Sequence, residues 1–340
     1  MIRACLIAAL TAANGVMGGE TVGVIDRADP RFDMLVPKDA KIEKLAGGFK
    51  WAEGPVWLEK RELLVFSDVP NNVVHGYKPG DTKVTDFLRP SGYTGEKRRS
   101  GEPGSNGLTV DAEGRLLLCE HGDRRVARLE KDGKKTTLAD KFEGKRFNSP
   151  NDLAMHSKGD VYFTDPPYGL EKGVDDPAKE IPFQGVYRIS KSGEVTLLSK
   201  TISRPNGIAF SPDEKTLYVA NSDPLKPVIY SFEVKDDGTV GEEKVFFDTM
   251  KWMLKGHKGL PDGMKVDASG NLWATGPGGV FVITPKSEYL GRIDPQVPTA
   301  NCGFGEDGSV LYLTANNWLC KIKTSTTGHK DLFGKVFKVD

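Results

Sequence analysis

Apolar residues occur along the chain in short runs, and no stretch has the 3.6-residue period of a long amphipathic helix. The runs are separated by turn clusters rich in Gly, Asp, Ser or Pro, such as Ala112-Glu113-Gly114 and Ser157-Lys158-Gly159. Short apolar runs joined by such turns are typical of β-hairpins. The pattern predicts β-strands throughout, including residues 126–129, 185–189, 228–234 and 279–283.

One arrangement recurs along the sequence. A polar residue is followed by an apolar run, a turn and a second apolar run. The residues that open the copies are Glu53, Asn106, Asn151, Asn206, Asp262 and Asn301, at spacings of 53, 45, 55, 56 and 39 residues. About four short strands in each of six copies predict an all-β fold, a six-bladed β-propeller. A β-sandwich also has many strands, but it does not account for six copies that begin alike.

The N-terminal residues do not follow the repeat. Arg3 precedes an apolar stretch over residues 4–13, and small residues follow before the first acid, Glu20. This order is typical of a secretory signal peptide, and the apolar stretch is about half the ~20 residues of a spanning helix. We expect residues 1–20 to be a signal peptide and residues 21–340 a single propeller domain. The protein would then be periplasmic or secreted, or cytoplasmic if the N-terminus is not cleaved.

Net charge and cysteine content restrict the classes of partner and metal that the protein is expected to bind. Lys and Arg number 47, as do Asp and Glu, so the formal net charge is zero. Nucleic acid and anionic membrane surfaces are therefore disfavoured, and the charge says nothing about oligomeric state. The cysteines have no zinc-site spacing. If Cys5 is removed with the signal peptide, at least one of the other three cysteines is unpaired. The sequence does not decide whether Cys302 and Cys320 form a disulfide.

The innermost strand of each propeller blade lines the central channel, so the six opening residues should meet at one mouth. All six carry a side-chain oxygen, and two of them are acids that would repel each other without a cation. Oxygen donors favour one divalent cation, Ca²⁺ ahead of Mg²⁺ or Mn²⁺, with Zn²⁺ last because it prefers imidazole or thiolate. Alternatively, Asn-Gly and Asp-Gly are turn dipeptides, an interpretation that explains Glu53 poorly.

Loops between the second and third strands of each blade should return to the same mouth. His121 is in such a loop, and it is a candidate for the pocket wall or for a proton acceptor. Asp165 and Tyr168 are further substrate-binding candidates, together with Asn106 and Asn151, although each has a structural alternative. Residues 89–105 are predicted to form a long loop, either a lid over the mouth or a solvated segment.

Several motifs together resemble a known family. They are Trp51-Ala-Glu-Gly-Pro-Val-Trp57, Ser105-Asn-Gly-Leu108, Cys119-Glu-His-Gly-Asp-Arg-Arg125, Asn148-Ser-Pro-Asn-Asp152, Tyr162-Phe-Thr-Asp-Pro-Pro-Tyr-Gly169, Arg204-Pro-Asn-Gly207 and Pro261-Asp-Gly-Met-Lys265. Over residues 45–325 the chain resembles the regucalcin/gluconolactonase family of calcium-dependent lactonases, most closely its bacterial gluconolactonase branch. The resemblance implies a six-bladed propeller with one divalent cation in its channel.

The resemblance also implies residue roles. Glu53, Asn206 and Asp262 match cation ligands, Asp262 also matches the general base, and Asn151 matches an asparagine beside metal and substrate. Regucalcin-type members carry an arginine two residues before that asparagine, where this chain has Ser149, so the substrate contacts of that arginine are in doubt. The predicted function is metal-dependent hydrolysis of a sugar lactone to its aldonic acid. The alternatives are another metal-dependent hydrolase, acting on phosphotriesters or organophosphates, and a non-catalytic ligand- or protein-binding propeller.

Overall fold

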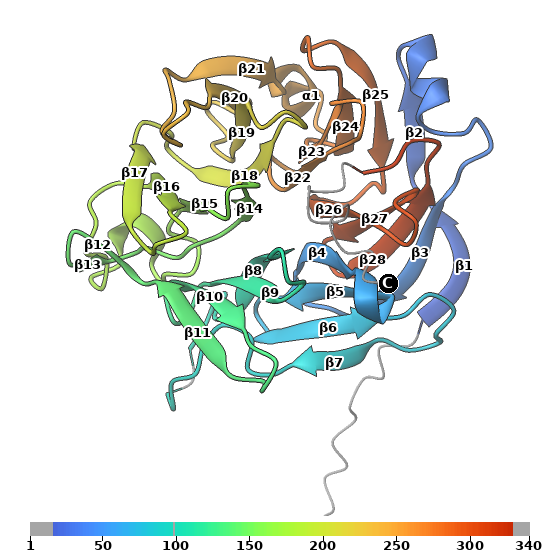
Figure 1. Cartoon of the computed structure of the whole chain (residues 1–340). Coiled ribbons are helices and arrows are strands. Elements are labelled where there is room, and N and C mark those ends of the chain that lie inside the picture. Colours follow the sequence, from blue (N-terminus) through green and yellow to red (C-terminus); the bar gives the residue numbers. More distant parts are fainter. Residues whose placement is uncertain (1–15, 98, 329–340) are drawn as a thin grey trace, which may run out of the picture.

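Six β-sheets surround a central channel in the computed structural model, which describes residues 16–97 and 99–328 (Figure 1). This arrangement confirms the predicted six-bladed propeller. Most of the predicted signal peptide lies outside the described residues, and β1 (Val16–Val22) includes the remainder. The described residues also contain one short α-helix, α1 (Met250–Leu254), and 3-10 turns at Pro30–Met34, Glu59–Arg61 and Gly173–Asp175.

The first four blades are antiparallel four-stranded sheets. The first contains β4 (Ala52–Leu58), β5 (Leu63–Asp68), β6 (Val73–Tyr77) and β7 (Thr85–Leu88), and the second contains β8 (Ser105–Val110), β9 (Leu116–Glu120), β10 (Arg125–Leu129) and β11 (Lys135–Ala139). The third contains β14 (Leu153–Met155), β15 (Val161–Asp165), β16 (Gly185–Ile189) and β17 (Val195–Ser199). The fourth contains β18 (Pro205–Phe210), β19 (Thr216–Asn221), β20 (Val228–Glu233) and β21 (Lys244–Asp248).

The fifth blade contains β22 (Met264–Val266), β23 (Leu272–Gly276), β24 (Gly279–Ile283) and β25 (Tyr289–Asp294), with β2 (Val24–Arg27) at its outer edge. A separate hairpin, β12 (Lys141–Phe142) with β13 (Lys145–Arg146), lies between the second and third blades in the sequence. The predicted runs at 126–129, 185–189, 228–234 and 279–283 correspond to β10, β16, β20 and β24.

The sixth blade joins the two ends of the domain. Strands β26 (Thr299–Gly305), β27 (Val310–Ala315) and β28 (Trp318–Lys323) pair with β3 (Ile42–Gly47), and β1 lies outside β3. In this ladder Leu319 faces Ala46 and Lys321 faces Glu43. Strand β3 thereby covers the edge that β28 would otherwise expose. The repeat alone did not predict this closure.

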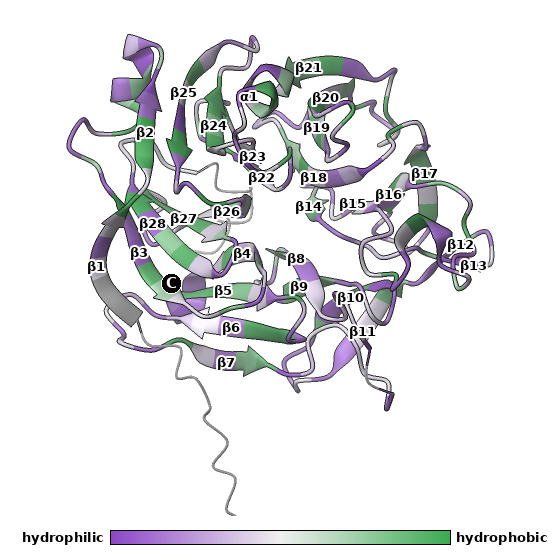
Figure 2. Ribbon diagram, turned by 180° about the vertical axis from the view of Figure 1, so that it is seen from behind, coloured by the Kyte–Doolittle hydropathy of each residue, from purple (hydrophilic) through white to green (hydrophobic). Residues whose placement is uncertain are grey.

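Apolar side chains pack between neighbouring blades, so the middle strands are buried on both faces. All five residues of β9 and of β15 are buried. Between the second and third blades, the rings of Phe147, Phe163 and Tyr187 contact one another at centroid distances of 5.0–5.3 Å. Figure 2 shows green, hydrophobic segments along strands throughout the ring, interspersed with purple, hydrophilic ones. Burial of both faces explains why the sequence shows apolar runs rather than strict alternation.

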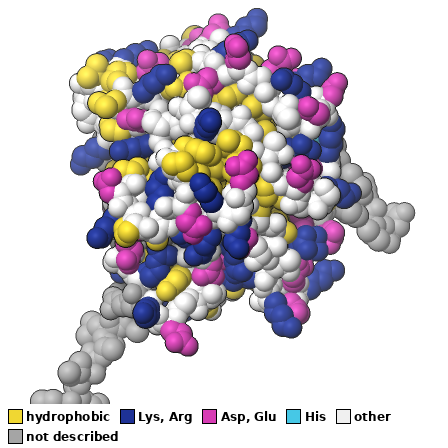
Figure 3. Space-filling view, turned by 90° about the vertical axis from the view of Figure 1, so that its left-hand side faces the viewer, with side chains coloured by type: hydrophobic (Ala, Val, Ile, Leu, Met, Phe, Trp, Pro, Cys, Tyr) yellow, Lys and Arg dark blue, Asp and Glu magenta, His cyan; other side chains and the backbone are white. Residues whose placement is uncertain are grey.

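Charges of both signs are interspersed over the face shown in Figure 3, in line with the zero net charge. Within the described ranges, no helix is long and apolar enough to cross a membrane. Cys119, Cys302 and Cys320 are buried free thiols, so Cys302 and Cys320 do not form a disulfide. Burial raises the pKa of Cys302 and of Cys320 to about 12.

Candidate active site

The inner strands β4, β8, β14, β18, β22 and β26 contact one another in sequence around the channel. The six opening residues lie in these strands or two positions before them. Five of these residues are at most 5% exposed, whereas Asp262 is half-buried and keeps access to solvent. Asn106 and Asn206 lie within strands β8 and β18. Their interpretation as turn dipeptides is therefore wrong.

The glycines that follow four of the opening residues allow neighbouring inner strands to approach closely. A Cβ atom at Gly207 would lie 2.0 Å from the carbonyl oxygen of Asp262, far inside van der Waals contact. The same crowding occurs around the ring, where a Cβ at Gly54, Gly107 or Gly263 would meet Asn106, Asp152 or Asn301 at 2.3, 2.4 and 1.9 Å respectively. The sequence needs glycine here because each of these backbones packs directly against a neighbouring strand, against its backbone at Gly54 and Gly207 and against a site side chain at Gly107 and Gly263.

Three asparagine side chains in the channel carry unpaired oxygens. The Oδ1 atoms of Asn106, Asn151 and Asn206 are buried, and none accepts a hydrogen bond from a described residue. Asn301 differs, because its Oδ1 accepts a hydrogen bond from the Cys302 amide at 2.9 Å. A buried polar atom without a partner costs about 1–3 kcal/mol. Three amide oxygens in this state at one end of a channel form a donor set that suits a hard cation.

Acidic side chains surround these amides. Burial, followed by the charge of Asp152, raises the pKa of Glu53 to about 8. Burial also raises the pKa of Asp262 well above its usual range, and the carboxylates of Glu53, Asp152 and Glu102 add to this effect. The pKa of Asp152 is raised by burial as well. A divalent cation among these acids would favour their ionised forms.

The channel donors are a mixture of amide and carboxylate oxygens. In the part of the chain that the structure describes, no group of three or more His, Cys, Asp or Glu side chains is arranged to hold a metal ion. The residues that fit a cation are therefore the mixed set predicted from the sequence, Glu53, Asn151, Asn206 and Asp262, with the free oxygen of Asn106 beside them.

His121 lies against this set. Its ring is fully buried, with Nε2 3.4 Å from Nδ2 of Asn151. Its Nδ1 is 3.5 Å from Oε2 of Glu102, a residue in the connection between β7 and β8. The sequence pattern gave no reason to single out Glu102 or Asp152. Glu102 lies in a loop without periodicity, and Asp152 directly follows the opening residue Asn151 at a position that the repeat does not mark.

The predicted lid, residues 89–105, is held against the neighbouring loops. The Arg99 guanidinium donates hydrogen bonds of 2.8 Å to the carbonyl oxygens of Gly122 and Gly169. The backbone N–H of Ser100 donates to Glu171 at 3.0 Å. These contacts connect the loop to the second and third blades and bring Glu102 to the channel. Residues 91–92 and 103–105 are buried, whereas residues 94–97 and 100–101 are exposed, so the described part of the loop is anchored to the neighbouring blades but partly solvated.

The carboxylate of Asp165, predicted to contact substrate, instead accepts hydrogen bonds from backbone amides. Its two carboxylate oxygens accept hydrogen bonds from the amides of Asn148 and Ser149, at 2.8 and 2.7 Å. Burial raises its pKa to about 7. Asn221 has the same role in the next blade, where its Oδ1 accepts from the Arg204 amide at 2.9 Å. Both side chains fix the segment that leads into an inner strand, so we do not retain Asp165 as a substrate contact.

Ser149 is enclosed below the loop that follows β15. Its hydroxyl donates to the Pro166 carbonyl at 2.5 Å and accepts from the Gly169 amide at 2.9 Å. The side chain is fully buried, and the position of Gly169 is itself tightly bounded by Ser149 and His121. An arginine at position 149 would have to displace this loop.

Tyr168 lies at the mouth, as predicted. It is half-buried and forms a hydrogen bond with Ser222. Burial raises the pKa of Tyr168, and the negative charge of Asp262 adds to this effect. The structure thus brings together Glu53, Asn106, Asn151, Asn206, Asp262, His121 and Tyr168.

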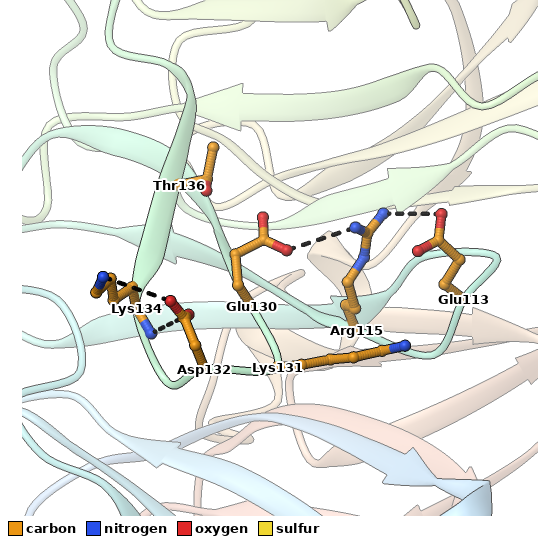
Figure 4. Close-up of a pocket in the computed structure, with 7 residues that line it drawn as sticks. All are labelled: Glu113, Arg115, Glu130, Lys131, Asp132, Lys134 and Thr136. Atoms are coloured by element: carbon orange, nitrogen blue, oxygen red, sulfur yellow. Dashed lines mark hydrogen bonds and ion pairs between the residues drawn. The ribbon is translucent and has the colours of Figure 1, made fainter.

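A hollow of about 460 Å³ at the second blade is unrelated to this site (Figure 4). It is lined by Glu113, Arg115, Glu130, Lys131, Asp132, Lys134 and Thr136. Its charges neutralise one another, since Arg115 pairs with Glu113 at 3.1 Å and with Glu130 at 3.4 Å. The hollow is a solvated surface feature that contains none of the predicted site residues.

Comparison with known proteins identifies the family of this chain. Residues 51–317 match the family described as the SMP-30/Gluconolactonase/LRE-like region. The chain belongs to this family. A gluconolactonase from Zymomonas mobilis is 40% identical in sequence to this protein. The alignment covers 93% of this chain and 90% of the relative. A pentonolactonase from Haloferax volcanii is 25% identical, over 77% of the chain and 80% of the relative.

A solved structure also resembles this family member. A gluconolactonase from Xanthomonas campestris is 30% identical and superposes with a TM-score of 0.78, covering 91% of this chain and 98% of the other. The match extends over the whole propeller. The predicted membership of the regucalcin/gluconolactonase family is confirmed.

Proposed function

We propose that this protein is a hydrolase that opens the ring of a sugar lactone to give the aldonic acid, with the help of one divalent cation in the channel. The observation that carries the proposal is the set of three buried, unpartnered amide oxygens beside the acids Glu53 and Asp262. The relatives named as lactonases support the reaction class. The acid-lined channel supports an enzyme over a binding scaffold, since a scaffold has no use for it.

Glu53, Asn151, Asn206 and Asp262 would hold the cation. Their donors are all oxygens, which favours Ca²⁺ ahead of Mg²⁺ or Mn²⁺ and makes Zn²⁺ a poor match. When bound, such a cation supplies a positive charge that polarises the lactone carbonyl and stabilises the developing oxyanion.

Asp262 would act as the general base. Its half-buried position gives it access to water. Burial, with the carboxylates around it, raises its pKa above that of an ordinary aspartate, and a bound cation would lower that pKa again. It accepts a proton as the water oxygen bonds to the lactone carbonyl carbon. The ring C–O bond then breaks, and the ring oxygen takes up the proton as it becomes a hydroxyl. Asn151 would orient the lactone, with Asn106, His121 and Tyr168 forming the wall.

Ring opening by pH-stat tests the proposal, with a panel of sugar lactones and full-length protein. We expect turnover that is abolished by EDTA and restored by Ca²⁺ or another divalent cation. Asp262→Asn should lose about 10²–10⁴-fold in kcat, whereas Asp213→Asn, in a hairpin turn of the fourth blade, should not.

Two results would overturn the proposal. Retained turnover in Asp262→Asn would move the base to another residue. The absence of turnover on every lactone, with folded and cation-loaded protein, would overturn the lactonase assignment and favour phosphotriesters or a binding role.

We also propose that the protein is exported, because of the signal-like pattern of residues 1–20. Fractionation of cells that express the full chain, with N-terminal sequencing of the product, tests this. An uncleaved cytoplasmic product would contradict it.

A further inference from the structure

Asn206 is held by a hydroxyl that cannot donate to it. The Nδ2 group of Asn206 is 2.9 Å from Oγ of Ser222, a side chain that is 5% exposed. The Ser222 hydroxyl also makes a short hydrogen bond with the carbonyl oxygen of Pro261, and it is hydrogen-bonded to the Tyr168 phenol. A carbonyl oxygen only accepts, so the single hydroxyl proton of Ser222 is committed to Pro261.

This commitment fixes the orientation of the Asn206 amide. Ser222 has only acceptor capacity left, so Asn206 must present its NH₂ group to Ser222. Its Oδ1 therefore points the other way, and this atom is buried without a partner. Because Pro261 precedes Asp262, the same hydroxyl connects Asn206 to the backbone of the proposed base.

A histidine holds Asn151 in a similar manner. Oε2 of Glu102 lies 3.5 Å from Nδ1 of His121, an ion-pair contact, and Nδ1 makes no hydrogen bond to a described residue. In the neutral ring tautomer that carries its proton on Nδ1, this proton faces the carboxylate. Nε2 is then an acceptor, and it faces Nδ2 of Asn151 at 3.4 Å. The Asn151 amide again presents its nitrogen to the wall, and its unpaired Oδ1 is the second buried oxygen of the channel.

We propose that Ser222 and the pair Glu102–His121 are positioning residues, which bind two channel asparagines by their amide nitrogens and so turn both amide oxygens toward the cation site. The two amides are reached from different blades by chemically different groups. An amide oxygen and nitrogen are almost equal in size, so packing alone does not distinguish the two orientations of an asparagine side chain. Only an acceptor placed at the nitrogen does so.

The inference rests on the cation site of the proposed function. Partners that orient metal ligands typically change metal affinity by about 10–100-fold when they are removed. Loss of either acceptor would allow the amide to rotate and present NH₂ to the cation. The loss of affinity would appear in cation binding, while the cost of leaving buried groups without their partner would appear separately in the stability of the cation-free fold.

Calorimetric titration of CaCl₂ into EDTA-treated, dialysed full-length protein tests this directly, with parallel titrations of MgCl₂ and MnCl₂. Ser222→Ala and His121→Phe should each weaken binding of the cation by about 10–100-fold. Ser222→Thr keeps a hydroxyl and should restore most of the affinity. Glu102→Gln keeps an acceptor for the ring N–H and should lose less affinity than His121→Phe.

Two buried side chains of the same types serve as matched controls. Ser211 and His156 lie at the opposite, hairpin ends of the fourth and third blades, and their hydrogen bonds are to local groups. Ser211→Ala and His156→Phe should leave the cation affinity unchanged. The melting temperature of each cation-free variant measures any general damage to the fold.

The outcomes separate the two proposals. Wild-type affinity in both Ser222→Ala and His121→Phe, or an equal loss in the control variants, overturns the positioning roles alone. Loss of affinity in the two variants with no lactone turnover in the wild type supports the positioning roles and overturns the lactonase. A wild-type protein that binds none of the three cations overturns both proposals.

Discussion

Replacing Gly207 with alanine tests whether the packing of the inner strands positions the catalytic base. A Cβ at this position would lie 2.0 Å from the Asp262 carbonyl oxygen and 2.8 Å from Cα of Gly263. Because such contacts are essentially never shorter than 3.0 Å, the Asp262 backbone must retreat by the difference of 1.0 Å. A displacement of about 1 Å in an active site can cost ~10²-fold in turnover, and overpacking costs about 1–3 kcal/mol of stability.

The assay pairs lactone turnover with urea unfolding. Gly76→Ala is the matched control, because Gly76 also lies within a strand, β6, but its Cβ would have no contact closer than 3.5 Å. We expect kcat/KM to fall about 100-fold in Gly207→Ala and to change little in Gly76→Ala. Normal turnover and normal stability in Gly207→Ala would refute the claim that backbone contact between these strands sets the place of Asp262.

Three further predictions concern other parts of the molecule. Chelation by EDTA should lower the melting temperature, and added Ca²⁺ at 100 times its Kd should restore about 2.7 kcal/mol of stability. Equal melting curves with EDTA and with Ca²⁺ would count against a bound cation. Glu120 is fully buried between Arg125 and Lys135, at 2.6 Å from each, and Glu120→Gln should cost about 3 kcal/mol in urea unfolding. The exposed pair of Asp132 with Lys134 is the comparison, and Asp132→Asn should cost little. The three buried thiols should not react with Ellman's reagent at pH 8 until the protein is unfolded, since burial raises their pKa values and keeps them protonated.

The propeller was predictable because each blade repeats the same local chemistry. The polar opening residue and the hairpin turn recur in each copy, a glycine follows four of the six opening residues, and each of these signals is local in sequence. The same repeat located Glu53, Asn206 and Asp262. Their convergence follows from the blade geometry alone, since inner strands share one channel.

Other features depend on contacts that no local pattern reveals. Glu102 reaches the channel because Arg99 and Ser100 bind groups from later blades, about 20 to 70 positions further along the chain. Asp165 ends β15, beside a loop like the one that contains His121, yet its carboxylate is bound by two backbone amides. The sequence shows which side chains have suitable chemistry, but not which of them the backbone has already occupied.

The pairing of β3 with β28 has a consequence for biosynthesis. The strand that completes the last blade is among the first parts of the domain to be translated, and its partner residues 318–321 are among the last. Because the ring closes through a contact between the two ends of the propeller domain, complete folding of the domain must wait until residues 318–321 have been translated. Blades one to five can form as translation proceeds, while β3 stays unpaired with β28. A chain released before residue 318 would therefore present two exposed strand edges, and it should be more readily degraded or aggregated than the full-length product.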